Sequence, residues 1–168
     1  MTRFLFAAAV AIAAATPAVA QDAPAAAPAD TFNGPRIGLN VGFADPEDIF
    51  GTEAFTWGVE AGYDASLGGV VVGATAEFQD SKDTGRDLSA VGRVGVKPTS
   101  NVLVYGLAGY SNLKVIDGLK LDGVRVGGGV EVVPIEGSPV SFKIEQRYTN
   151  YELGAEVYQT LVGIGFHL

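Results

Sequence analysis

The chain has no cysteine, a single histidine and few charged residues, which make up 18% of its 168 amino acids. The absence of cysteine excludes disulfide scaffolds, cysteine-ligated zinc sites, thiol catalysis and lipid attachment at an N-terminal cysteine. With 11 basic and 19 acidic residues the net charge is -8. This charge excludes nucleic acid as an expected partner, because phosphate binding depends on lysine and arginine. Beyond the first 20 residues, the sequence also lacks the long apolar run of a membrane helix.

The first 20 residues have the three-part pattern of a secretory signal peptide. A positive charge at Arg3 precedes an apolar stretch too short to span a bilayer, and the small residues of 18–20 resemble a cleavage site. We therefore predict a cleaved signal peptide over residues 1–20, which exports the protein from the cytoplasm. Residues 21–33 are rich in alanine and proline without periodicity, which predicts a flexible periplasmic lead-in.

From residue 34 onward, apolar residues recur at every second position, the period of a half-buried strand. This pattern occupies 35–44, 54–64, 70–79, 88–97, 102–111, 124–132, 140–149 and 158–168. The segment 102–111 alternates least cleanly, so the sequence leaves open which of its two sets of side chains points outward. The connections are rich in glycine, proline and aspartate and too short for a crossover helix, which predicts antiparallel neighbours. Asp117-Gly118 is a strong hairpin signal. Eight strands in up-and-down order can close into a barrel that has no exposed edge.

Glycine and charge indicate which face of the barrel is inside. Most glycines within the strands lie on the polar face, where they would weaken a solvated strand without gain but would make room inside a narrow barrel. The same face carries five positive and four negative side chains, whose near balance suits a confined space. The predicted interior charge network comprises Arg36, Glu60, Glu77, Arg93, Arg125, Glu131, Lys143, Glu145 and Arg147.

The expected turn positions predict pairs of residues that face each other inside the barrel. These pairs are Arg147 with Gly127, Glu145 with Gly129, Lys143 with Glu131, Glu60 with Gly73, and Arg93 with Tyr105. The first pair places a large side chain opposite glycine. The last pair predicts a cation–π contact.

Aromatic residues on the apolar face fall near the two ends of the strands. Those expected at the outer interface are Phe43, Phe55, Trp57, Phe78, Tyr110, Tyr148 and Tyr158, and those at the inner interface are Tyr63, Phe142 and Phe166. Two such belts are typical of a membrane barrel, whereas a soluble core has no reason to sort aromatics by height. We therefore predict an all-β fold, an eight-stranded antiparallel up-and-down transmembrane β-barrel over residues 34–168, rather than a soluble periplasmic barrel.

Three stretches, FNGPRIGLNVGF (32–43), YGLAGYSN (105–112) and KIEQRY (143–148), resemble the small eight-stranded outer-membrane β-barrel family of opacity-type surface proteins, OmpX and the OmpA barrel domain. The resemblance implies an integral protein of the Gram-negative outer membrane that contacts lipid and lipopolysaccharide. It also implies handling by periplasmic chaperones and the barrel-insertion machinery. We expect a monomer. Members usually end in an aromatic residue, whereas this chain ends in Leu168.

The sequence offers few candidates for chemistry, and we expect no catalytic residue, cofactor or metal. His167 could pair with Ser141 as a hydrolase base and nucleophile, but a hydrogen-bonded interior histidine is the favoured interpretation. The acidic segment 45–53 could hold Ca²⁺, yet its spacing fits no EF-hand, and a solvated loop is favoured. The glycine-rich stretch 123–129 precedes no helix, which excludes a dinucleotide site.

The leading hypothesis is therefore a non-enzymatic barrel with a structural or surface-interaction role, displaying short acidic loops. The connections expected outside, 45–53, 80–87, 112–122 and 150–157, together carry more negative than positive charge. A small-solute pore of low conductance is the alternative, although side chains just fill a barrel of eight strands. A lipid-modifying barrel enzyme is the third possibility.

Overall fold

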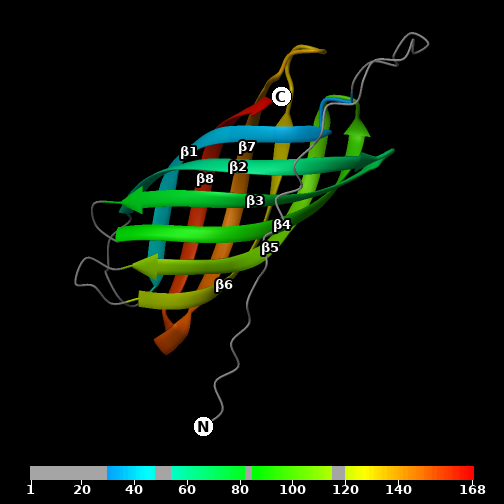
Figure 1. Cartoon of the computed structure of the whole chain (residues 1–168). Helices are drawn as coiled ribbons and strands as arrows, with labels where there is room; N and C mark the ends of the chain where they lie inside the picture. The colour runs from blue at the N-terminus through cyan, green and yellow to red at the C-terminus, as the bar shows by residue number, and fades with distance from the viewer. Residues whose placement is uncertain (1–29, 48–53, 82–84, 115–119) are drawn as a thin grey trace, which may run out of the picture.

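The computed structural model describes residues 30–47, 54–81, 85–114 and 120–168. These residues form a closed barrel of eight strands (Figure 1), which are β1 (Gly34–Glu47), β2 (Ala54–Leu67), β3 (Val70–Ser81), β4 (Gly85–Thr99), β5 (Val102–Lys114), β6 (Lys120–Val132), β7 (Val140–Tyr151) and β8 (Glu156–His167). Each strand is antiparallel to its neighbours in sequence, and β1 closes the barrel against β8. The predicted fold class is confirmed. Among the described residues, no helix has the length and apolar character needed to cross a bilayer.

The period-two pattern determines the two surfaces of this barrel. Along β1, Ile37, Leu39 and Val41 are exposed on the outer surface, whereas Arg36 and Asn40 are buried inside. The other strands alternate in the same way. Because a soluble protein would bury its valines and leucines, an apolar exterior around a charged interior is the arrangement suited to lipid.

The facing of β5 follows the sequence prediction. Leu103 and Tyr105 are buried inside the barrel, and Val104 and Tyr110 lie on its outer surface. All the aromatic side chains assigned to the two belts also lie on the outer surface. Rings on adjacent strands contact one another, with centroids 5.8 Å apart for Phe43 and Phe55, 6.2 Å for Trp57 and Phe78, and 5.0 Å for Tyr148 and Tyr158.

The two ends of the barrel differ in their connections. We call the end that carries Gly34 and the C-terminal Leu168 the inner end, and the opposite one the outer end. At the inner end, β2 turns into β3 through Gly68 and Gly69, and Gly68 takes the positive φ of 75° that such a tight turn requires. At the outer end, the short helix η1 (Glu152–Gly154) joins β7 to β8. The predicted Asp117-Gly118 turn lies outside the described residues, as do residues 1–29 and 48–53.

The strand registers agree with part of the prediction. Between β6 and β7, Arg147 lies opposite Gly127, Glu145 opposite Gly129 and Lys143 opposite Glu131, as expected. A Cβ added to Gly127 would lie 2.5 Å from the carbonyl oxygen of Gln146. Glycine is therefore required at this position, where the backbones approach closely.

Two predicted pairs are wrong. Glu60 lies opposite Glu77 instead of Gly73, because the strands pair up to the turn at Gly68 and Gly69. Arg93 lies opposite Leu107 instead of Tyr105, because the strands pair up to Thr99 and Val102 and the turn between β4 and β5 is centred about one residue later than the prediction requires. The predicted contact nevertheless forms on a diagonal, with the Arg93 guanidinium carbon 4.9 Å from the Tyr105 ring centroid.

Candidate functional site in the barrel interior

The interior of the barrel is filled with buried ionisable side chains. The nine residues of the predicted network all point inward and have at most 6% of their surface exposed. Two further carboxylates join them, Asp64 with no exposed surface and Asp87 with 7%. Since a buried charge is costly unless it is paired, the contacts of these groups determine whether the interior is stable.

Near the inner end, Arg93 of β4 joins two carboxylates from other strands. Its Nε and Nη2 atoms donate hydrogen bonds of 2.9 and 2.5 Å to the two oxygens of Asp64. Its Nη1 atom donates a 2.7 Å hydrogen bond to Glu131. Such a two-pronged contact fixes the guanidinium in position and orientation. Arg93 thereby ties together β2, β4 and β6, none of which is adjacent to another in the barrel wall.

Asp64 connects Arg93 to a second cluster around Glu60. Arg36 Nε lies 3.0 Å from Asp64, while Arg36 Nη1 donates a 2.5 Å hydrogen bond to Glu60. Lys143 Nζ donates to the other oxygen of Glu60 at 2.6 Å, and Asn40 donates to the same oxygen at 2.9 Å. Two cations and an amide thus neutralise and orient this carboxylate.

Arg147 of β7 occupies the centre of the network, and its side chain has no exposed surface. Its two terminal nitrogens donate hydrogen bonds of 2.8 Å each to the two oxygens of Glu77, and its Nε donates one of 2.7 Å to Glu145. Glu145 also accepts hydrogen bonds from Tyr105 Oη and, at 3.2 Å, from Lys143. Arg147 therefore joins the Glu60 cluster to the outer half of the barrel.

Towards the outer end, Arg125 of β6 takes the place that Arg93 has at the inner end. It lies 3.5 Å from Glu77 and forms an ion pair with Asp87. It also donates hydrogen bonds of 2.9 Å to Ser89 and 3.0 Å to Thr149. The hydroxyl of Tyr151 donates to Asp87 at 2.8 Å, so this carboxylate is neutralised by Arg125 and hydrogen-bonded by Tyr151.

Together these contacts form one chain of alternating charges along the interior. In order from the inner end it runs Glu131, Arg93, Asp64, Arg36, Glu60, Lys143, Glu145, Arg147, Glu77, Arg125, Asp87. Among the described residues, each lysine or arginine in it contacts two carboxylates. Charges so arranged stabilise one another in a dry interior and hold the strands in one register.

An apolar cluster lies at each end of this row of interior charges. At the inner end, Phe32 has no exposed surface and belongs to a cluster that includes Val71, Leu103 and Val133. Its ring contacts the His167 ring edge to face, with centroids 5.5 Å apart. At the outer end the closing cluster comprises Leu113, Leu121, Tyr151 and Ala155.

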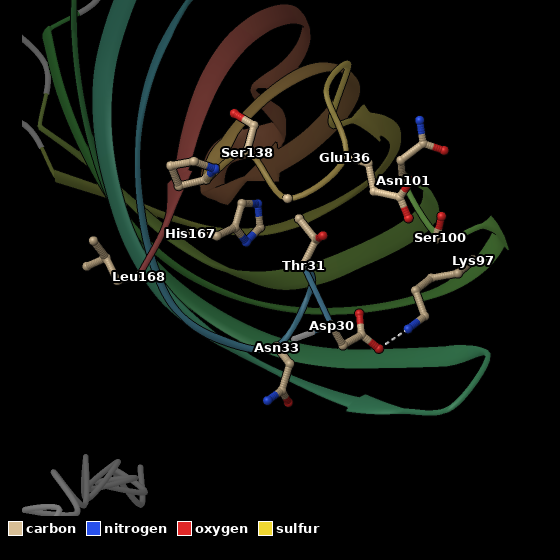
Figure 2. A pocket seen from close by; sticks show the side chains of 12 residues that line it. Asp30, Thr31, Asn33, Lys97, Ser100, Asn101, Glu136, Ser138, His167 and Leu168 are labelled. Carbon is tan, nitrogen blue, oxygen red and sulfur yellow. Dashed lines mark hydrogen bonds and ion pairs between the residues drawn. The ribbon is translucent and has the colours of Figure 1, made fainter. Parts of the chain in front are cut away.

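Phe32 is held in place by contacts of its neighbours Asp30 and Asn33. The sequence pattern assigns this segment, residues 30–33, to the flexible lead-in. Asp30 forms an ion pair with Lys97 (Figure 2) and accepts a 2.5 Å hydrogen bond from Ser66 Oγ. Asn33 accepts a 3.0 Å hydrogen bond from the Ser66 backbone nitrogen. Beside this segment, a cavity of about 630 Å³ opens at the inner end and is lined in part by Lys97 and His167.

The Asp30 contact makes the docking of this segment depend on pH. Burial acts to raise the pKa of Asp30, but the hydrogen bonds from Lys97 and Ser66 outweigh it and lower the pKa below its ordinary value. A carboxylate with a lowered pKa stabilises the docked state above its ordinary pKa, and this contribution is lost as the pH falls through the lowered value.

A closed barrel with an apolar exterior, a paired charged interior and the first and last strands beginning and ending at the same end is the expected geometry of a bacterial outer-membrane protein. A family model described as outer membrane protein beta-barrel domain matches residues 4–167. The chain belongs to this family. No curated protein matches the chain.

Solved outer-membrane barrels share the fold. Neisserial surface protein A is 14% identical over 81% of this chain and 98% of its own, with a TM-score of 0.58. The N-terminal β-barrel domain of Pseudomonas aeruginosa OprF is 14% identical over 78% of this chain and 96% of its own, with a TM-score of 0.56. PagL, described as an outer membrane enzyme, is 10% identical over 79% of this chain and 99% of its own, with a TM-score of 0.55. At these identities the likeness shows the fold alone.

In this outer-membrane barrel the predicted candidates Ser141 and His167 do meet, together with Glu131. Ser141 Oγ donates a 2.6 Å hydrogen bond to Glu131, and His167 Nε2 lies 2.9 Å from the same carboxylate oxygen and 3.3 Å from Ser141 Oγ. A hydrolase triad needs the acid on one ring nitrogen and the nucleophile on the other. Here a single nitrogen faces both groups, and Ser141 has no exposed surface.

Two charged residues of the network were missed by the sequence analysis. Asp64 ends a predicted strand on its polar face, and Asp87 was assigned to an outer connection. Strand parity could have found both, since Asp64 has the parity of Glu60, and Asp87 that of Ser89 and Arg93. Because Asp87 points inward, it adds no negative charge to the outer surface.

Proposed function

We propose that this outer-membrane barrel is non-enzymatic and has a structural and surface-interaction role, as a rigid closed wall that displays its outer connections. The single observation that carries the proposal is the continuous chain of ion pairs through the interior. Its links join strands that are not neighbours in the wall, as Arg147 joins β7 to Glu77 of β3, so the barrel is braced across its width.

The same chain argues against the alternative of a small-solute pore. An eight-stranded barrel encloses little more space than its side chains fill, and here Arg93, Arg147 and Arg125 reach across it to carboxylates on other strands. Apolar clusters around Phe32 and Tyr151 lie inside the barrel towards its two ends. A steady current would require several buried ion pairs to break at once.

The third possibility, a lipid-modifying enzyme, is disfavoured by the location of the candidate group that the sequence suggested, Ser141 with His167. Lipid acyl chains contact the outer surface, whereas Ser141 and Glu131 are buried inside.

The proposal also includes export by the signal peptide 1–20, insertion by the outer-membrane machinery with chaperone help, contact with lipid and lipopolysaccharide, and a monomeric state.

The proposal predicts that the purified full chain, refolded in detergent and added to a planar bilayer, gives no steady single-channel current. A large trimeric porin in the same bilayer is the positive control. A stable open level from this chain would favour the pore instead.

In cells, deletion of the gene should increase dye entry through the outer membrane, and the full chain should restore the barrier. Unchanged dye entry would contradict the structural role.

The enzymatic alternative is tested with lipid hydrolysis by the wild type and by Ser141→Ala. We expect no hydrolysis above background from either protein. Hydrolysis that disappears in the variant would overturn the non-enzymatic assignment.

A further inference from the structure

Asn33 lies between the docked segment and the first strand. It follows Phe32, which has no exposed surface, and precedes Gly34, at which β1 begins. Its own side chain is exposed, and its carbonyl oxygen accepts the 3.0 Å hydrogen bond from the Ser66 backbone nitrogen. Of the five asparagines in the chain, it is the only one followed by glycine; the others are Asn40, Asn101, Asn112 and Asn150. An asparagine side chain can react with the backbone nitrogen of the next residue, and glycine hinders this reaction least because it has no Cβ.

The entry to β1 requires glycine at position 34. Gly34 has a φ of 119°, a value that residues with a side chain rarely adopt. A Cβ added to it would lie 3.2 Å from the carbonyl oxygen of Leu168, which is closer than ordinary van der Waals contact. The fold therefore keeps an unshielded backbone nitrogen directly after the side chain of Asn33.

The Ser66 backbone N–H activates the carbonyl group of Asn33. Attack of a nitrogen on the carbonyl carbon moves negative charge onto the oxygen, and a donor that is already in place stabilises this charge. Ser66 is paired in register with Val71 of β3, and its hydroxyl donates a 2.5 Å hydrogen bond to Asp30. Because the side chain of Asn33 is exposed, water reaches the site to accept and supply protons.

We propose that Asn33 is a site of spontaneous deamidation and that the isoaspartate formed there releases residues 30–33 from the barrel. The step is intramolecular: the backbone nitrogen of Gly34 forms a bond to Cγ of Asn33, the Cγ–Nδ2 bond breaks, and ammonia leaves with the proton of that nitrogen. Water then opens the resulting succinimide ring, and the ring nitrogen regains a proton from it. Attack of water on the side-chain carbonyl gives aspartate, whereas attack on the backbone carbonyl gives isoaspartate.

Isoaspartate does not fit the docked segment. It lengthens the main chain by one methylene group between Phe32 and Gly34, both of which have fixed positions. The Phe32 ring contacts the His167 ring, with centroids 5.5 Å apart, and Gly34 is paired with Asp64 of β2. The carbonyl group that accepts the hydrogen bond from Ser66 also becomes part of the main chain. The modification therefore converts a docked segment into a released one, whatever the function of the barrel.

The test incubates the refolded full chain in detergent at mildly alkaline pH and follows modification and docking in the same samples. Peptide mass spectrometry should show the mass increase of deamidation at Asn33, and an isoaspartate-specific methyltransferase should label the same peptide. The fraction of isoaspartate should equal the fraction of chains whose Ser66 amide has lost its protection from hydrogen exchange. Asn101 also lies at the inner end but precedes Val102, so it is the matched internal control and should stay unmodified.

Two variants separate the altered main chain from the added charge. Asn33→Gln keeps a side-chain amide but needs a larger ring to react, so it should stay unmodified and keep the protection of Ser66 throughout the incubation. Freshly prepared Asn33→Asp carries the negative charge on an unaltered main chain, and its carboxylate accepts the hydrogen bond from Ser66. It should therefore protect Ser66 as the wild type does.

Two results would overturn the proposal. One is an unmodified Asn33 in the folded chain under conditions that deamidate this residue in the urea-unfolded chain. The other is a population of chains that contain isoaspartate at this position and keep the full protection of the Ser66 amide.

Discussion

Replacing Arg147 with methionine is expected to lower the free energy of unfolding by about 3–5 kcal/mol. The substitution keeps the volume and apolar stem but leaves Glu77 and Glu145 without the guanidinium that both contact. Glu77 then retains Arg125 and Glu145 retains Lys143, but two buried carboxylates that lose a shared cation are still among the most destabilising results of a single substitution. The measurement is urea unfolding of the refolded barrel in detergent, followed by gel mobility of unboiled samples, in which the folded barrel runs faster.

A double-mutant cycle separates lost pairing from lost packing. If the cost comes from the unpaired charge, Glu77→Gln added to Arg147→Met should recover part of the stability, so that the two changes are strongly non-additive. Arg86→Met makes the same replacement at an exposed position and should change the free energy of unfolding by less than about 0.5 kcal/mol. Additive effects in the cycle would show that the ion pairs contribute little to stability.

Replacing Phe32 with alanine is expected to cost about 3 kcal/mol, as for other fully buried aromatic side chains. The loss should appear as undocking of residues 30–33 from an intact barrel, because Phe32 precedes β1. The Ser66 amide donates to Asn33 in the docked state, so its hydrogen exchange reports undocking directly. Exchange at Ser66 should become much faster in the variant, while amides in the middle of β5 keep their protection.

Thr31→Ala is the control for this experiment. Thr31 lies in the same turn and is only half-buried, so its truncation should leave exchange at Ser66 close to that of the wild type. Lowering the pH below the pKa of Asp30 should decrease the protection factor of the Ser66 amide in the wild type, that is, its protection relative to the intrinsic exchange rate at the same pH, because the contact with Lys97 is then lost. Unchanged exchange in Phe32→Ala would show that the segment does not depend on its aromatic anchor.

The strands and their two faces could be predicted because a single physical constraint acts along the whole chain. Every strand separates lipid from a polar interior, so the alternation at Ile37, Leu39 and Val41 is repeated in each of them. This parity indicates whether a side chain points inward. It does not indicate how far a strand extends, and Asp87 was therefore assigned to a connection although β4 begins at Gly85.

The partners of the interior charges depend on register, which parity alone leaves undetermined. Moving the turn between β2 and β3 by two residues keeps every side chain on its face but exchanges Gly73 for Glu77 opposite Glu60. Contacts across the barrel, such as that of Arg147 with Glu77, depend on all the registers together. The docking of Phe32 could not be predicted either, because residues 30–33 have no periodicity and are held by single contacts.

The most direct test of the account uses Trp57, the only tryptophan of the chain. It lies on the outer surface of β2, 47% exposed, and its ring contacts Phe78. In vesicles of phosphatidylcholine with brominated acyl chains, the fluorescence of Trp57 should be strongly quenched, while aqueous iodide should have little effect. Strong quenching by iodide with none by the brominated lipid would contradict a barrel that turns its apolar face to the membrane.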